Sequence, residues 1–354
     1  MDKKDSYYKI YTSSFDDPSR WSDWFVHQVC SDEDILLGYG LDGSPVSGLA
    51  MRRYDFSPLR PGCEHSLNAG YLAGVATLPK ARGKGEMSAL MTDTLHTARL
   101  RKIDVCTLIP ASRRLYFFYD KFGFSTVFYR CEERYTSVHD FSPLPGWETV
   151  APDFESFEEL EKQRHYSIRH SRKDFSEILA DARMCRTHAL AVRTADGSRG
   201  MIFAKTESDG TVFVHCLMSD NNDAAEAALQ ALRKEVGAQP FVVMRDPEGA
   251  RRAQLRAYGM IRIVNAGEVL AGVAAAMPEL KQAIRVYDPV LRENCGTYIL
   301  DKGLARKEPY RYTGTRLSLD VNIEVLARIL FNTPPAGEIF GLPTMRPFMS
   351  LMLD

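Results

Sequence analysis

The chain has 354 residues, of which 45% are hydrophobic and 26% charged, and its formal net charge is -1. This length predicts two or three domains with sizeable cores, and the composition is that of an ordinary globular protein. The charge balance offers no basic excess for nucleic acid or for a membrane surface, so neither is an expected partner.

The N-terminal sequence and the cysteines together favour the cytoplasm. The stretch MDKKDSYYKIYTSSF has no apolar signal-peptide core, and no stretch approaches the roughly 18 apolar residues of a membrane span. The seven cysteines are scattered without a CxxC pair, which predicts a reducing compartment. We expect all seven thiols to be buried and to act as small hydrophobic groups.

The first third of the chain predicts alternating strands and helices. In chain order the expected elements are a strand, turn and strand over 36–53, a strand over 70–77, a helix over 87–98, a strand over 105–109, a helix over 114–121 that Ser112 caps and Gly123 ends, and a strand over 124–129. A stretch rich in proline and acidic residues follows and indicates a domain boundary near residue 145.

The middle third repeats this order. The expected elements are a strand over 211–218, a helix over 224–236, a strand over 241–244, and a helix over 248–258 that Gly259 ends. We interpret this as a duplicated fold unit. His165 and His170 lack a third residue at metal-ligand spacing and are expected on a solvated helical face.

The last third predicts a small α+β domain. AIRVYDP, GTYILDK and TRLSLDV are short strand-like runs, and an amphipathic helix follows over 323–331. The three predicted domains are therefore 1–145, 146–261 and 262–354.

A basic glycine-containing loop joins the strand at 70–77 to the next helix. Free amides at a helix start stabilise a bound phosphate. Gly83 and Gly85 would let the backbone approach it closely, and Lys80, Arg82 and Lys84 add positive charge. Walker and Rossmann loops fit worse, because Gly85 stands where a Walker loop needs Ser or Thr and Ser88 where a Rossmann loop needs glycine or alanine. A solvated basic turn is the alternative interpretation of the loop alone.

The order V-A-T-L-P-K-A-R-G-K-G, helix, strand and LYFFYDKFGF resembles the GNAT acetyltransferase superfamily over about residues 20–130. In its pyrophosphate motif, Arg/Gln-x-x-Gly-x-Gly/Ala, Arg82 and Gly85 match and Met87 departs from the usual small residue. The enhanced-intracellular-survival (Eis) type of acetyltransferase tolerates a large residue at this position. The whole chain resembles the Eis arrangement, and its segment RVYDPVLRENCGTYIL looks like part of a sterol-carrier-type domain. The resemblance implies tandem GNAT folds with mixed, splayed sheets and flanking helices, followed by an α+β domain.

The same resemblance implies acetyl-CoA as cosubstrate, with no metal. The pantetheine arm would lie against the backbone of Val75, Ala76 and Thr77, and the pyrophosphate against Arg82, Gly83, Lys84, Gly85, Glu86, Met87 and Ser88. Tyr119 matches the family's proton donor in Y-x-x-F-G-F, since a phenol can donate to a departing thiolate. Tyr116 is the fallback acid, and a purely structural aromatic core is the other interpretation of this helix.

The apolar ending MRPFMSLMLD is expected to dock on an apolar surface, because each fully buried side chain gains about 1.5–3 kcal/mol. It completes the core of the last domain or, as in the Eis type, brings the terminal carboxylate of Asp354 to the active site as the base. A side-chain carboxylate is a further alternative for that base.

The second copy lacks the functional parts of the first. Ser219-Asp-Asn-Asn-Asp replaces the basic loop, and Leu255 stands four residues before Gly259, where the first copy has its tyrosine. We therefore expect a catalytically silent copy that walls the substrate pocket or mediates assembly.

The resemblance implies an N-acetyltransferase for a primary amine of a small molecule or peptide. A non-catalytic acyl-CoA or lipid-binding module and an enzyme for longer acyl chains are the alternatives. By resemblance alone we expect a homo-oligomer, with the hexamer as the candidate state.

Overall fold

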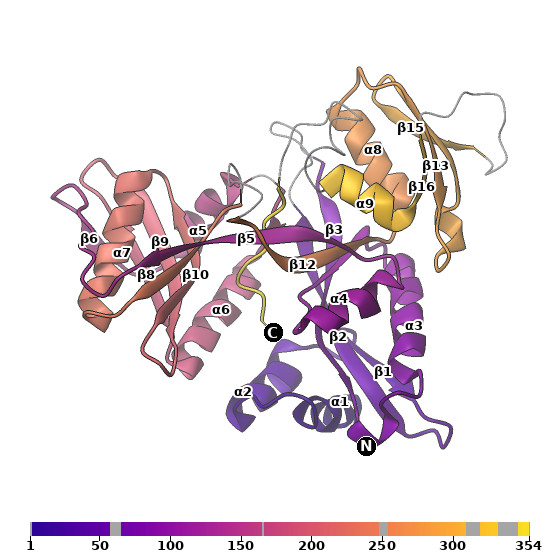
Figure 1. Cartoon of the computed structure of the whole chain (residues 1–354), viewed down its shortest axis with the longest axis horizontal. Helices are drawn as coiled ribbons and strands as arrows, with labels where there is room; N and C mark the ends of the chain where they lie inside the picture. Colours follow the sequence, from indigo (N-terminus) through magenta and orange to yellow (C-terminus); the bar gives the residue numbers. More distant parts are fainter. Residues whose placement is uncertain are drawn as a thin grey trace. The chain divides into compact units, whose positions relative to one another are not determined.

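The computed structural model describes residues 2–56, 65–164, 166–247, 254–308, 319–331 and 346–353. The chain forms two compact units (Figure 1). Met1–Phe128 and Ala257–Pro347 make the first unit, and Tyr129–Arg256 and Phe348–Leu353 make the second. The first unit is thus built from two stretches of chain that flank the second in sequence. The division into three domains at 145 and 261 stays a prediction.

The first unit begins with helices and an antiparallel sheet. Helices α1 (Lys3–Thr12) and α2 (Ser19–Trp24) and the π-helix η1 (Phe25–Val29) precede strands β1 (Ile35–Tyr39), β2 (Pro45–Phe56) and β3 (Leu67–Thr77). A 3-10 turn, η2 (Pro79–Ala81), leads into α3 (Glu86–Leu100), and then come β4 (Val105–Leu108), α4 (Arg113–Asp120) and β5 (Ser125–Tyr135). These elements confirm the ones predicted between residues 36 and 129, although the Ser112 side chain makes no capping hydrogen bond at the start of α4.

Helix α3 covers one face of this sheet. Its buried residues Leu90, Met91 and Leu95 pack with Leu49 and Leu72 of the strands in one hydrophobic cluster. The i, i+4 spacing along α3 places these side chains on one face. This packing fixes the start of α3 beside the end of β3.

Strands β5 and β12 (Arg256–Ile263) complete the first sheet, whose strand order is β1-β2-β3-β4-β12-β5. Strand β12 pairs antiparallel with β4, from Met260 opposite Leu108 to Ile263 opposite Val105. The helix predicted over 248–258 is therefore wrong from Arg256 onward, and 248–253 lie outside the described residues. The misassigned residues Arg256 to Tyr258 are the exposed or half-exposed start of β12, and its buried run begins only at Gly259.

The second unit contains β6 (Glu148–Val150), α5 (Phe154–Lys162), β7 (Ile168–Arg169), α6 (Arg172–Cys185), β8 (His188–Arg193), β9 (Arg199–Thr206), β10 (Val212–Ser219), α7 (Asn222–Val236) and β11 (Phe241–Arg245). Its sheet runs β5-β11-β10-β9-β8-β6. The predicted strand, helix and strand at 211–244 are confirmed. Strands β10 and β11 are parallel, as are β3 and β4, so β10–α7–β11 repeats β3–α3–β4.

Two predictions about individual side chains are wrong. His170 is buried rather than solvated, because its Nδ1 lies 2.7 Å from Oε1 of the buried Glu161. Cys185 is exposed, since it ends α6 on the surface, and Cys295 is only partly buried, whereas Cys106 and Cys216 are buried as expected. His165 and Cys63 lie outside the described residues.

The C-terminal part of the first unit carries a separate sheet with strand order β15-β14-β13-β16. Its elements are α8 (Ala266–Ala276), β13 (Gln282–Tyr287), η4 (Arg292–Asn294), β14 (Gly296–Asp301), β15 (Leu304–Glu308), β16 (Leu319–Asn322) and α9 (Ile323–Phe331). Together with the large mixed sheet, this confirms the predicted α/β and α+β class. Within the described ranges, no helix is long and apolar enough to cross a membrane.

Candidate functional site

Strands β3 and β4 separate partway along their length. Their parallel pairing runs from Ala69 opposite Val105 to Tyr71 opposite Thr107 and then ends. Strand β3 continues to Thr77, held by β2 alone. The backbone of Val75, Ala76 and Thr77 therefore borders a stretch where β3 has no β4 partner, which is the separation expected from the sequence.

A β-bulge interrupts β3 within this stretch. Gly48 pairs with Ala76 and Ala50 with Ala73, so Gly74 and Val75 together face Leu49. Gly74 has a φ of +55°, in the left-handed region that glycine adopts without strain. Such bulges turn a peptide plane out of the regular ladder.

Arg82 holds the loop after β3 through two hydrogen bonds. The Arg82 Nε donates to the Thr77 carbonyl at 3.0 Å, and its Nη2 lies 3.1 Å from the Ser14 hydroxyl. Gly83 and Gly85 follow with φ of +76° and +89°. A Cβ at either glycine would meet no atom within 4 Å, so their backbone faces open space.

Six consecutive amides at the start of α3 have no acceptor. Within the described ranges, no hydrogen bond involves the N–H groups of residues 83–88, and Gly85 occupies the N-cap position without a side chain to satisfy them. Exposed amides at a helix start carry partial positive charge and bind anions. Exposed Lys84 stands among them, and Lys80 is exposed just upstream.

Met87 stands where the family motif usually has a small residue. Its side chain is half-buried against the cluster formed by α3 and the sheet. Val75 borders the same cluster, and Tyr119 is one of its members. The end of β3, the first turn of α3 and Tyr119 thus meet around one core.

Tyr119 is buried at the end of α4. Only 5% of it is exposed, and its ring lies 5.2 Å from that of Phe118 and 5.8 Å from that of Phe124. Burial raises the pKa of Tyr119 well above its usual value of 10. Its hydroxyl makes no hydrogen bond within the described ranges, so this neutral donor is uncommitted.

Tyr116, the fallback acid, is committed elsewhere. Its hydroxyl donates to the Tyr258 carbonyl at 3.0 Å. This bond ties α4 to β12 and makes Tyr116 a structural residue.

The apolar tail is buried, as expected, but it belongs to the second unit. The Phe348 N–H donates to the Tyr166 carbonyl at 2.7 Å, and the Ile168 N–H donates to the Phe348 carbonyl at 3.2 Å. The Arg164 guanidinium lies 4.2 Å from the Phe348 ring centroid, a cation–π geometry. The tail therefore does not complete the last predicted domain. Asp354 lies outside the described residues.

The corresponding loop of the second unit is closed to an anion. The Asn221 side chain caps α7 by accepting from the Ala224 N–H at 2.9 Å. Asp220 accepts from Arg199 at 2.9 Å. The Ala224 amide at the start of α7 is thus already hydrogen-bonded. The Asp220 carboxylate beside it would repel a phosphate. Leu255 does not correspond to Tyr119, because it directly precedes strand β12, whereas Tyr119 lies in helix α4.

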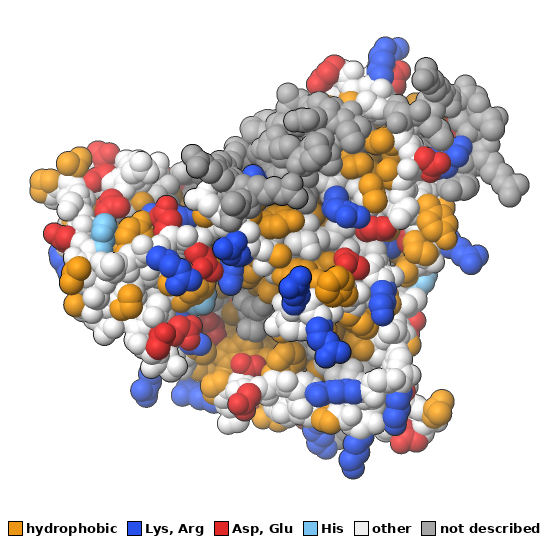
Figure 2. All heavy atoms as spheres, viewed as in Figure 1, with side chains coloured by type: hydrophobic (Ala, Val, Ile, Leu, Met, Phe, Trp, Pro, Cys, Tyr) orange, Lys and Arg blue, Asp and Glu red, His pale blue; other side chains and the backbone are white. Residues whose placement is uncertain are grey.

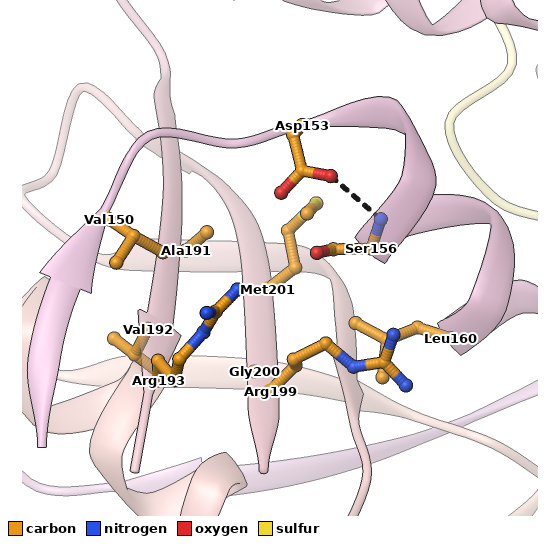
Figure 3. A pocket seen from close by; sticks show the side chains of 10 residues that line it. All are labelled: Val150, Asp153, Ser156, Leu160, Ala191, Val192, Arg193, Arg199, Gly200 and Met201. Atoms are coloured by element: carbon orange, nitrogen blue, oxygen red, sulfur yellow. Dashed lines mark hydrogen bonds between the residues drawn. The ribbon is translucent and has the colours of Figure 1, made fainter. Parts of the chain in front are cut away.

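A small pocket of the second unit lies between strands β8 and β9 and the start of α5 (Figure 3). The Asp153 carboxylate at its rim accepts from the Ser156 N–H at 2.8 Å, and Arg199 is paired with Asp220. These polar groups already serve the fold. On the face drawn in Figure 2, basic and acidic side chains are interspersed, in keeping with the near-zero net charge.

Comparison with known families gives one match. Residues 2–127 match the family described as Acetyltransferase (GNAT) domain. The matched residues lie in the first unit, and the similarity supports acyl transfer as the general chemistry. Comparison with curated proteins gives no match.

Similar solved structures span nearly the whole chain. A probable N-acyltransferase from Enterococcus faecalis V583 has a TM-score of 0.76 at 14% identity, covering 98% of this chain and 96% of that one. Eis1 from Mycobacterium abscessus has a TM-score of 0.71 at 14% identity, with coverage of 98% and 96%. A GCN5-related N-acetyltransferase from Anabaena variabilis ATCC 29413 has a TM-score of 0.70 at 17% identity, with coverage of 98% and 95%. At these identities the likeness establishes the fold.

Proposed function

We propose that this chain is an acetyl-CoA-dependent N-acetyltransferase acting on a primary amine of a small molecule or a peptide. The observation that carries the proposal is the run of unpartnered amides at residues 83–88, placed at the start of α3 next to the free end of β3. A long anionic cofactor with a peptide-like arm suits this combination of an anion site and an unpaired strand edge.

The cofactor would lie along these two features. The pyrophosphate would take the amides of Gly83, Lys84, Gly85, Glu86, Met87 and Ser88 with the charge of Arg82. The pantetheine amides would pair with the backbone of Val75, Ala76 and Thr77. No metal is required, since the pyrophosphate charge is balanced by amides and basic side chains.

Transfer proceeds by direct attack in this proposal. The neutral amine attacks the thioester carbonyl, the C–S bond breaks, the nitrogen gives up a proton and the sulfur receives one. Tyr119 supplies the proton to sulfur and is reprotonated from solvent. Its hydroxyl supports this role, because it is uncommitted within the described ranges and a neutral phenol has a proton to give to the thiolate.

The terminal carboxylate of Asp354 is the proposed base. Support comes from the ordered tail before it: Phe348, Met349, Met352 and Leu353 are all buried. A chain end held in this way can deliver its α-carboxylate reproducibly, whereas free ends fray. The second unit, 146–261 in the predicted division, would then be a silent copy that anchors the tail.

The remaining assignments follow from the Eis-type resemblance. We propose that 262–354 is a sterol-carrier-like domain, that the protein works in the cytoplasm, and that it forms homo-oligomers, with the hexamer as the candidate state.

The proposed function is tested by incubating the protein with acetyl-CoA and a panel of primary amines while following release of free thiol. Turnover with at least one amine is expected, together with acetyl-CoA binding in calorimetry. Binding without turnover would support an acyl-CoA-binding module instead. Neither binding nor turnover would overturn the proposal.

The base is tested by extending the chain beyond Asp354 by a few residues. Such a chain should bind acetyl-CoA normally and lose activity, because the α-carboxylate becomes an amide. Asp354→Asn without extension is the matched control and should keep activity, since it retains the α-carboxylate. Full activity in the extended protein would exclude the terminal carboxylate.

A further inference from the structure

A tyrosine of α1 lies against the bulge of β3. Tyr7 is fully buried, and its hydroxyl lies 3.0 Å from the Gly74 carbonyl oxygen and 3.4 Å from that of Ala73. Burial raises the pKa of Tyr7 well above its usual value, so this hydroxyl stays a neutral donor.

Two glycines make room for this side chain. A Cβ at Gly48 would lie 2.8 Å from the Tyr7 ring, and a Cβ at Gly74 would lie 2.3 Å from the Tyr7 hydroxyl oxygen. Gly48 flanks the bulge on β2, and Gly74 belongs to it on β3. Both strands are therefore fitted closely around Tyr7.

The contact fixes the direction of one peptide group. In a trans peptide the C=O and the following N–H point in opposite directions. Because the Gly74 carbonyl points to Tyr7, the Val75 N–H points away from α1. Gly48 faces Tyr7 while its neighbour Leu49 belongs to the cluster that contains Tyr119, and successive strand residues face opposite sides. The Val75 N–H is thus turned away from the Tyr7 side.

We propose that Tyr7 is a positioning residue that holds the Gly74–Val75 peptide so that the Val75 amide donates to the thioester carbonyl oxygen of the bound acyl-CoA. This rests on the proposed function. Negative charge develops on that oxygen during attack, and a donor already aimed at it lowers the barrier without reorganisation. The hydrogen bond from Tyr7 also polarises the peptide, which strengthens its N–H as a donor.

The test compares Tyr7→Phe with Tyr11→Phe. Tyr11 lies one turn later on α1 and is equally buried; its ring also packs against Gly74, but its hydroxyl binds Asp17 at 2.7 Å. Tyr7→Phe should lower kcat about tenfold, less than the loss of a direct oxyanion donor, with the Kd for CoA unchanged. Tyr11→Phe should keep the wild-type kcat.

A spectroscopic readout separates positioning from a structural role. The carbonyl stretch of bound acetyl-CoA labelled with ¹³C should move to higher frequency in Tyr7→Phe and stay unchanged in Tyr11→Phe. Placing 3-fluorotyrosine at position 7 gives a stronger donor and should move the stretch to lower frequency, which keeps the test open if Tyr7→Phe does not fold.

The outcomes separate this inference from the proposed function. If the wild type turns over no amine and does not bind acetyl-CoA, both the proposed function and the inference about Tyr7 are overturned. If the wild type is active but the variants at position 7 keep its kcat and its carbonyl frequency, the inference alone is overturned. Equal losses in Tyr7→Phe and Tyr11→Phe would also overturn it, because they indicate a general effect of α1.

Discussion

At the scale of single residues, hydrogen bonding distinguishes two neighbouring tyrosines as candidate acids. Tyr116 and Tyr119 stand one turn apart on α4, and the sequence alone left both as candidates. The Tyr116 hydroxyl donates a hydrogen bond to the Tyr258 carbonyl. The Tyr119 hydroxyl makes no hydrogen bond within the described ranges, and Tyr119 belongs to the hydrophobic cluster against which Val75 packs. The structure thus favours Tyr119 by hydrogen bonding, which a sequence pattern does not reveal.

Tyr119→Phe should lower kcat by a factor on the order of 10²–10⁴, because the departing thiolate loses its acid. The Kd for acetyl-CoA should stay unchanged, since only the hydroxyl is removed. Steady-state kinetics with calorimetry measure both quantities. Tyr116→Phe is the control and should retain kcat within about twofold of wild type. A larger loss in Tyr116→Phe than in Tyr119→Phe would reverse the assignment.

Thiol reactivity should follow burial. Burial raises the pKa of Cys106 to about 12, so its reactive thiolate is scarce at pH 8, whereas Cys185 is exposed. A disulfide reagent should label Cys185 rapidly in the native protein and Cys106 only after unfolding. Mass spectrometry of the labelled peptides measures the order, and Cys185→Ser should remove the rapid reaction at that site. Rapid native labelling of Cys106 would contradict its burial.

At the scale of elements, the two copies of the strand–helix–strand unit differ at one helix start. Gly85 leaves the first amides of α3 open, while Asn221 caps α7 with its own side chain. The same backbone plan therefore makes an anion site in one copy and a self-satisfied helix in the other. This difference could be predicted from the sequence, because residue type alone sets it.

Gly85→Asp should weaken acetyl-CoA binding at least tenfold, because a carboxylate placed among the amides repels the pyrophosphate. Folding should survive, since aspartate tolerates a positive φ better than most residues do and no atom crowds the position. Gly197→Asp is the matched control, being another glycine with positive φ in open space. Calorimetric titration of both variants measures the effect. Equal affinities would argue against the loop as the pyrophosphate site.

Other elements could not be predicted from the sequence, for physical reasons. The start of β12, Arg256 to Tyr258, was taken for the end of a helix, because its pairing with strands distant in the chain leaves no signal in the local sequence. The bulge at Gly74 arises from a register shift against β2 and from Tyr7 of α1, and neither is local in sequence. Helix α6 was missed although Ser171 and Asp174 form a capping box at its start.

At the scale of the whole molecule, a buried ion pair joins segments that are distant in the chain. The Arg262 guanidinium on β12 binds Asp288 at 2.7 and 2.8 Å and donates from Nε to the Phe122 carbonyl at 2.6 Å. Both charged side chains are fully buried. One residue thus connects the end of α4, the returning strand β12 and the C-terminal sheet of the first unit.

Arg262→Met should destabilise the protein by about 3–5 kcal/mol, because Asp288 is left buried without its partner. Denaturant unfolding measures the loss. Arg285→Met is the control: its ion pair with Asp320, at 3.4 Å, is partly exposed and should contribute less than about 1 kcal/mol. Similar stability of the two variants would show that the Arg262 pair adds nothing beyond a surface pair.

The return of the chain to the first sheet through β12 affects the order in which the two units can fold during synthesis. Strand β4 meets its neighbour β12 only after the whole of β6 to β11 has been synthesised. Every strand of the second sheet, by contrast, exists before Arg256 is added. The usual order, in which the N-terminal domain folds first, is therefore inverted here: the copy that is made later can close its sheet earlier. The nascent first unit must meanwhile keep the open edge of β4 from pairing with other chains.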